Sequence, residues 1–109
     1  MLIASRELRV MGASGELVVP VRLYRPEQSG QAWSCSCEID WPDGRSASAA
    51  FGLDAVQALT LALQMIGAKI YTSEAHRTQR LRWTEPGQGY GFPISDNLRD
   101  LLIGDDRRD

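Results

Sequence analysis

Residues 33–41 alternate strictly between apolar and polar side chains, and no other feature constrains the fold of this chain as strongly. The odd positions hold the apolar residues Trp33, Cys35, Cys37, Ile39 and Trp41. Successive side chains of a strand point to opposite faces of a sheet, so a period of two predicts one buried and one solvated face. We therefore expect an antiparallel sheet that is covered on one side.

The spacing of the apolar residues then changes to that of a helix. Steps of three and four residues separate the next apolar side chains, which are Val56, Leu59, Leu63, Ile66 and Ile70. This spacing places them on one side of an α-helix, and we expect that side to face the sheet. Asp54 is the predicted N-cap, and Gln57 can return a hydrogen bond to the cap amide. The helix should end near Tyr71 or Ser73.

Two predicted hairpins supply the strands of the sheet. The first joins a strand over residues 7–10 to a strand over residues 16–24. The second turns at Pro42-Asp43-Gly44, because Pro presets φ and Gly accepts a positive φ. It leads from the strand 33–41 into a returning strand over residues 45–51.

Several positions refine this pattern. Pro20 lies within the strand 16–24 and cannot donate a ladder hydrogen bond, so we expect an edge position or a bulge there. The returning strand is rich in Ala and Ser, which indicates either a helix close above it or an outer position in the sheet. Residues 25–30 are typical of a polar loop. A weak pattern around Leu81 and Trp83 indicates a last short strand.

Together these elements predict a single α+β domain over residues 1–104. Its antiparallel sheet should have four or five strands, with one long helix packed on one face. Residues 94–103 could form a short terminal helix. Residues 105–109 are expected to be a frayed C-terminal tail.

Composition and charge exclude several classes of function. The hydrophobic fraction of 43% and the charged fraction of 24% are typical of a globular protein. A net charge of -2 gives no overall positive field that would attract nucleic acid or an anionic membrane. We expect no signal peptide and no membrane helix, since no apolar run approaches about 20 residues. The predicted location is cytoplasmic.

Few residues could support catalysis or bind a metal. Cys35 and Cys37 are the only cysteines, and we expect buried free thiols because a bridge between them would strain the strand. His76 is the only imidazole, and the negative end of the helix should favour its protonated form. The glycines of residues 87–91 lack the spacing of a Walker loop. We therefore predict no enzyme, no metal and no cofactor.

The basic segment 77–83 is the best candidate for a binding surface. Arginine pairs with phosphate or carboxylate, and aromatic rings stack on bases or form contact surfaces, as Phe92 could here. The candidate partner-binding residues are Arg77, Arg80, Arg82, Trp83 and Tyr90. Alternatively, these arginines are solvated and pair with Glu74, Glu85 and the C-terminal aspartates. The acidic balance of the whole chain disfavours nucleic acid as the partner.

The far side of the predicted helix is unusually apolar for a solvated surface. Leu61 points nearly opposite the core stripe, Met65 lies at its flank, and Lys69 is the only charged residue after the cap. We predict that this face is covered, either by the C-terminal segment 92–103 or by a second copy of the chain. Leu61 and Met65 are the candidate residues for that contact.

Three segments resemble a family of small bacterial proteins with a domain of unknown function. They are the strand Trp33–Cys35, the helix start Phe51–Leu59 and the terminal turn Gly91–Ile94. The resemblance implies the same order of elements and brings no activity, cofactor or site residue. We therefore predict a non-catalytic, protein-binding or accessory module whose partner is a protein or the chain itself. The alternative is a nucleic-acid-associated protein that uses residues 77–83.

Overall fold

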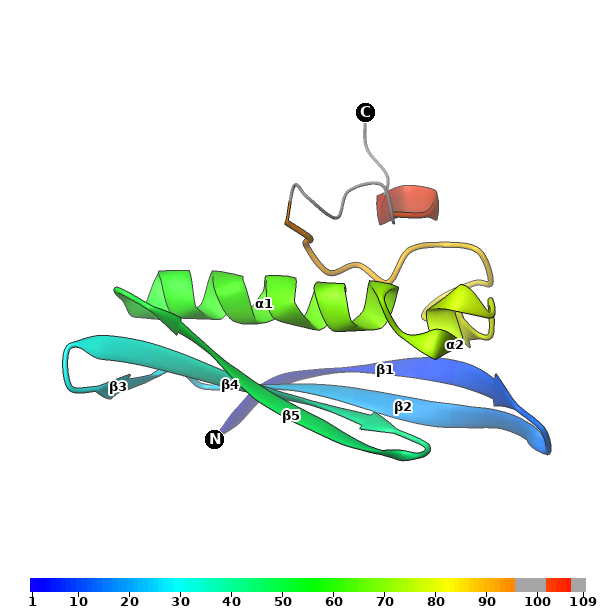
Figure 1. Cartoon of the computed structure of the whole chain (residues 1–109), viewed down its shortest axis with the longest axis horizontal. Helices are drawn as coiled ribbons and strands as arrows, with labels where there is room; N and C mark the ends of the chain where they lie inside the picture. The colour runs from blue at the N-terminus through cyan, green and yellow to red at the C-terminus, as the bar shows by residue number, and fades with distance from the viewer. Residues whose placement is uncertain (96–101, 107–109) are drawn as a thin grey trace.

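Six strands and one long helix form two layers in the computed structural model, which describes residues 1–95 and 102–106 (Figure 1). The strands are β1 (Leu2–Gly12), β2 (Gly15–Tyr24), β3 (Glu27–Ser29), β4 (Ala32–Trp41), β5 (Gly44–Gly52) and β6 (Leu81–Arg82). The helices are α1 (Ala55–Tyr71), α2 (Glu74–Arg77) and the 3-10 turn Gly104–Asp106. No helix in the described ranges is long and apolar enough to cross a membrane.

β4 organises the antiparallel sheet because it has partners along both of its edges. β5 pairs with it along one edge, from Trp33 opposite Gly52 to Trp41 opposite Gly44. β2 and β3 pair with separate stretches of β4 and therefore follow one another along its second edge. β1 pairs with the outer edge of β2, and β6 pairs with the far edge of β1.

The prediction of four or five strands was too low, because β3 lies within the segment that was predicted to be a loop. Its three residues are all exposed and show no alternation, so only their pairing with residues 32–34 of β4 makes them a strand. The weak strand pattern near Leu81 is confirmed by the pairing of β6 with β1. The antiparallel sheet with one long helix is also confirmed.

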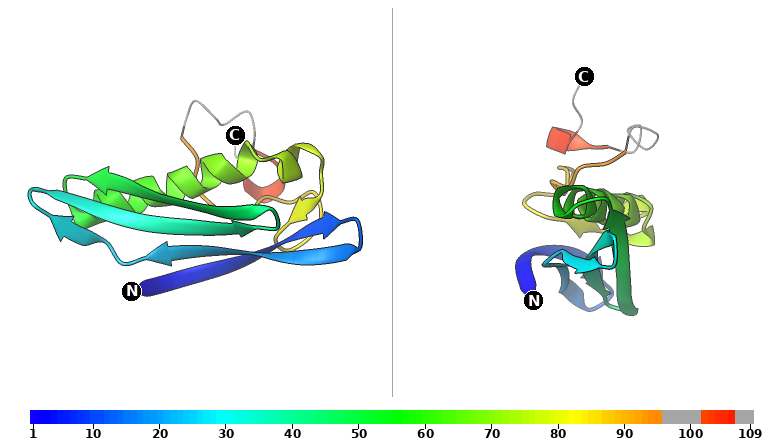
Figure 2. Two further views of the ribbon diagram at one scale, coloured as in Figure 1. Left: turned by 60° about the horizontal axis from the view of Figure 1, so that its bottom comes forward. Right: turned by 90° about the vertical axis from the view of Figure 1, so that its left-hand side faces the viewer.

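The alternation of residues 33–41 is confirmed as the inner face of β4. Cys35, Cys37 and Ile39 are 0%, 2% and 1% exposed, and the two tryptophans of the strand pack against the same core. α1 covers this face and runs next to the β4–β5 hairpin (Figure 2). The thiols therefore belong to the central core of the molecule.

Small side chains allow α1 to lie close to β5. A Cβ atom added at Gly52 would come within 2.5 Å of the backbone nitrogen of Ala58. Ala50 on β5 and Ala62 on α1 are also buried. Both expectations for the Ala- and Ser-rich strand hold, since β5 has α1 above it and, among the described strands, pairs only with β4.

The predicted helix begins where expected. Asp54 is the N-cap, and its carboxylate accepts a 2.8 Å hydrogen bond from the Gln57 amide. The Gln57 side-chain oxygen accepts a 2.6 Å hydrogen bond from the amide of Leu53, one residue before the cap amide that was predicted to donate it. The helix ends at Tyr71, as predicted.

The predicted core stripe of α1 is wrong at its first member. Val56 is 71% exposed, and Leu59 and Leu63 are only partly buried. The fully buried line on α1 consists of Ala58, Ala62, Ile66 and Ile70. The alanines face the sheet because the close approach to β5 leaves no room for larger side chains, and this rotates the larger residues to the rim.

Pro20 occupies a position where its missing N–H is not needed by β4. It pairs with Glu7 of β1, and the ladder between β2 and β4 covers only Val21–Leu23. β2 as a whole is therefore not an edge strand, but Pro20 itself has no ladder partner in β4. The register shift of the β1–β2 pair lies between Leu2 and Ala4, so no bulge is needed at the proline.

The C-terminal region differs from its predicted form where it is described. Residues 96–101 of the predicted terminal helix lie outside the described residues, as do residues 107–109 of the predicted tail. Asp106, which was assigned to the frayed tail, ends the 3-10 turn, and its carboxylate accepts hydrogen bonds from other parts of the chain.

The rotated core stripe leads to a test by paired substitutions. We expect Ile66→Ala to lower the free energy of unfolding by about 2–5 kcal/mol, because it leaves a cavity in the core. Val56→Ala should change it by no more than about 0.5 kcal/mol, because the side chain is solvated. Urea denaturation of both variants provides the measurement, and equal losses would contradict the observed orientation of α1.

Candidate functional site

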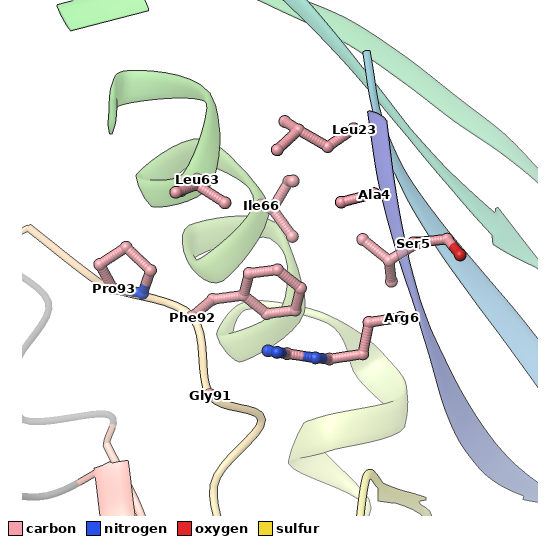
Figure 3. Close-up of a pocket in the computed structure, with 10 residues that line it drawn as sticks. Ala4, Ser5, Arg6, Leu23, Leu63, Ile66, Gly91, Phe92 and Pro93 are labelled. Atoms are coloured by element: carbon pink, nitrogen blue, oxygen red, sulfur yellow. The ribbon is translucent and has the colours of Figure 1, made fainter. Parts of the chain in front are cut away.

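A pocket of about 260 Å³ opens between β1 and α1 and is the candidate functional site (Figure 3). β1 contributes Ala4 and Arg6, α1 contributes Leu63 and Ile66, and the segment 91–93 forms the remaining wall. We call this space the β1–α1 pocket. Its lining is mostly apolar, and Arg6 is the charged residue within it.

The β1–α1 pocket exists because α1 packs on β4 and β5 rather than on the other hairpin. The inner side chains of β2, including Leu23, therefore face a space that the helix does not fill. Gly67 allows the segment 91–93 to cross α1 closely, since a Cβ atom there would collide with the Pro93 carbonyl oxygen. This crossing provides the third wall.

Arg6 is positioned by aromatic rings. Its guanidinium carbon lies 3.8 Å from the centre of the Trp83 ring and 4.8 Å from that of Phe92, distances typical of cation–π contacts. One guanidinium nitrogen donates a 3.1 Å hydrogen bond to the Tyr90 carbonyl oxygen. Burial lowers the pKa of Arg6 and Asp106 partly offsets this, but a guanidinium stays charged in proteins.

Asp106 holds the loop that carries these contacts. Its carboxylate accepts hydrogen bonds from the backbone amides of Tyr90 at 2.8 Å and Gly91 at 3.1 Å. The same carboxylate accepts a 2.7 Å hydrogen bond from the Tyr71 hydroxyl at the end of α1. The described C-terminal turn therefore fixes one wall of the pocket.

Three aromatic rings pack together and support the same loop. Tyr71, His76 and Tyr90 meet edge to face with centroid distances of 4.9, 5.1 and 5.5 Å. The Nδ1 atom of His76 shares a 2.7 Å hydrogen bond with the Tyr90 hydroxyl. Burial and the nearby Asp106 raise the pKa of Tyr90 to about 12, so its phenol is neutral at physiological pH. None of these rings lines the β1–α1 pocket, and their role there is support.

The position of His76 after the helix predicted a protonated imidazole, but its surroundings in the structure favour the neutral form. Burial lowers the pKa of His76, which opposes the predicted protonation by the helix end. The histidine lies inside the short helix α2, against the rings of Tyr71 and Tyr90, instead of capping α1. Desolvation by these surroundings therefore opposes the protonated form.

The structure separates the five predicted partner-binding residues. Arg77 is exposed, whereas Arg80 donates to the Met11 carbonyl oxygen at 3.0 Å. Arg82 pairs with Glu16 at 2.9 Å, and neither Glu74 nor Glu85 is its partner as the alternative interpretation expected. Trp83 lies against Arg6 at the pocket, and Tyr90 is 1% exposed.

Leu61 and Met65 were predicted to be covered by residues 92–103 or by a second copy of the chain, and residues 96–101 of that segment lie outside the described residues. Leu61 is 38% exposed, and Met65 is partly buried against the core. Phe92 and Pro93 contact α1 at Gly67, on a different side of the helix. Coverage of Leu61 and Met65, by the rest of the C-terminal segment or by a second copy of the chain, stays a prediction.

Cysteine and metal chemistry have little basis in this geometry. Cys35 and Cys37 are free and buried, and burial raises the pKa of both thiols. A reactive cysteine needs the opposite shift. Among the described residues, no group of three or more His, Cys, Asp and Glu side chains could hold a metal ion.

Sequence reasoning missed Arg6 and Asp106. The two-residue period provided a signal for Arg6, because it shares a face with Leu8 and Val10, which are 0% and 2% exposed. A cation on the buried face of a strand indicates a special site. Asp106 has no such signal, since its role depends on contacts with residues far away in the chain.

Two glycines provide a matched test of the loop. Gly87 and Gly91 have similar positive φ angles of 85° and 79°, but only a Cβ at Gly91 would meet Trp83, at 2.5 Å. We expect Gly87→Ala to cost about 1–2 kcal/mol from backbone strain alone. Gly91→Ala should cost about 1–3 kcal/mol more, because it overpacks the Arg6–Trp83 contact. Thermal unfolding of the pair measures the difference, and equal costs would contradict the packing described here.

The lowered pKa of His76 makes stability depend on pH. Below its usual value of about 6.5 the unfolded chain binds a proton that the folded chain resists, so stability falls as pH decreases. Between about pH 7.5 and about pH 5 the wild type should lose more stability than His76→Gln. Urea denaturation at the two pH values measures this, and an NMR titration that places the pKa of His76 at or above its usual value would contradict it.

Comparison with known proteins adds a family to this geometry. Searches of curated proteins and of solved structures found no match. Residues 4–94 match the family described as a domain of unknown function, DUF6968. The match includes β1, α1 and the segment 91–93 that line the pocket. The chain therefore belongs to the DUF6968 family.

Proposed function

We propose that the chain is a non-catalytic protein-binding module that takes up an extended segment of its partner along β1. The free edge of β1 beside the β1–α1 pocket carries this proposal. Within the described residues, β6 pairs with β1 only at Arg9 and Val10. Residues 2–8 have β2 on one side and no described strand on the other.

A free strand edge next to an apolar pocket is suited to strand addition. The edge offers unpaired backbone N–H and C=O groups, which bind an extended peptide through main-chain hydrogen bonds. Every second side chain of the added strand would point toward α1, where Leu63, Ile66 and Phe92 line the pocket. An extended partner segment with apolar residues at alternate positions therefore fits best.

The other predicted functions have less support. For nucleic acid, Arg80 and Arg82 are already engaged by the Met11 carbonyl and by Glu16. For catalysis, the ionisable pair His76 and Tyr90 supports the loop and does not line the pocket. A cytoplasmic location is part of the proposal and is supported by the free thiols Cys35 and Cys37.

The proposal predicts binding of extended peptides that depends on the pocket. The probe is a pool of fluorescein-labelled peptides of about six residues with Leu, Ile, Val or Phe at alternate positions. Fluorescence anisotropy should show binding to the wild type, and Ala4→Phe should abolish it by filling the pocket. Amide hydrogen exchange should slow at alternate residues within 2–8, because those amides face the free edge.

Ala13→Phe is the matched control, because Ala13 is exposed in the turn between β1 and β2. This variant should bind the pool as the wild type does. Equal binding to the wild type and Ala4→Phe, or no binding at all, would contradict the proposal. A second copy of the chain is the remaining candidate occupant of this edge. Sedimentation equilibrium detects a dimer, and a dimer in which residues 2–8 are protected from hydrogen exchange without peptide would assign the edge to the second copy instead.

A further inference from the structure

Arg6 differs from every other arginine on the described strands because it forms no ion pair with a described residue. Each of the other four has a carboxylate oxygen between 2.6 and 3.8 Å from a guanidinium nitrogen, and they are Arg9, Arg22, Arg45 and Arg82. Asp106 is the carboxylate that acts on Arg6 electrostatically, but it does not form an ion pair with it. Arg6 is also partly buried, and a partly desolvated cation strongly favours an anionic partner.

Contacts with its neighbours preorganise the Arg6 guanidinium for such a partner. Trp83 and Phe92 pack against it, and the Tyr90 carbonyl accepts a hydrogen bond from one of its N–H groups. Arginine has five N–H donors, so further donors remain for a carboxylate, which it can bind in a bidentate manner. Figure 3 shows the side chain reaching from β1 toward Phe92 at the side of the pocket. A fixed donor pays little conformational entropy on binding.

The position of β6 limits where an added strand can run. β6 occupies the edge of β1 at Arg9 and Val10, so a strand along residues 2–8 must end or turn away at that point. Arg6 lies next to this end of the free edge. A partner segment that ends at this point would place its C-terminal carboxylate near Arg6 if it runs parallel to β1. It would place its N-terminal ammonium group there if it runs antiparallel. Charge complementarity therefore favours the parallel orientation.

We propose that the partner segment is a protein C-terminus whose terminal carboxylate pairs with Arg6. This inference rests on the proposed function and specifies the chemistry of the segment that β1 binds. The apolar part of the pocket receives the side chains that precede the terminus. The guanidinium thereby recognises the free carboxylate at the end of the partner chain.

Three labelled peptide pools test the inference on the wild-type protein. They share the alternating apolar pattern and differ only at the C-terminus, which is a free acid, an amide, or an amide that follows a terminal Glu. By anisotropy, the free-acid pool should bind about tenfold or more tightly than the amide pool, because it gains a charge-assisted hydrogen bond. The pool with the terminal Glu should bind like the amide pool.

Arg6→Gln should remove the difference between the acid and amide pools. Arg9→Gln is the matched control, because Arg9 lies on the same strand but pairs with Glu16 and does not line the pocket. This control should keep the difference. If Arg6→Gln fails to fold, the comparison of the three pools on the wild type still decides the inference.

The outcomes separate this inference from the proposed function. Equal binding of the acid and amide pools, both blocked by Ala4→Phe, would overturn the role of the carboxylate and leave strand addition intact. Binding of the terminal-Glu pool as tightly as the free-acid pool would overturn the assignment to a chain terminus. Insensitivity of every pool to Ala4→Phe would overturn both proposals.

Discussion

The close contact between α1 and the β4–β5 hairpin determines the rest of the structure. The backbone of Ala58 lies so close to Gly52 of β5 that a Cβ atom on the glycine would not fit, and Ala50 and Ala62 are buried between the same two layers. Because α1 packs on that side of the sheet, it covers the inner face of β1 and β2 only in part. The β1–α1 pocket is the direct consequence of this asymmetric packing.

A second constraint shapes the uncovered side. The segment 91–93 crosses α1 at Gly67, and Asp106 links Gly91, its first residue, to Tyr71 at the end of the helix. Together with Trp83 this loop places aromatic rings around Arg6, which forms no ion pair within the described part of the chain. The proposed binding of a chain terminus depends on both constraints, since one provides the apolar space and the other provides the fixed cation.

Local periodicity explains which elements could be predicted. Residues 33–41 and the helix from Asp54 to Tyr71 have regular patterns, caps and turns that act over a few residues. The pattern was less reliable for the face of α1, because Val56 fits the spacing but lies on the side of the helix that its close approach to β5 turns away from the sheet. β3 shows the opposite failure, since its residues have no pattern and become a strand through pairing alone.

The sequence by itself determined the fold class, the two hairpins, the capped helix and the buried thiols, because these follow from side-chain period and from residues near in the chain. Only the tertiary structure decided the site. The hydrogen bond from Arg6 to the Tyr90 carbonyl joins residues 84 positions apart, and that from Tyr71 to Asp106 joins residues 35 positions apart. No local pattern encodes such contacts, since they form only when separate elements are brought together around one core.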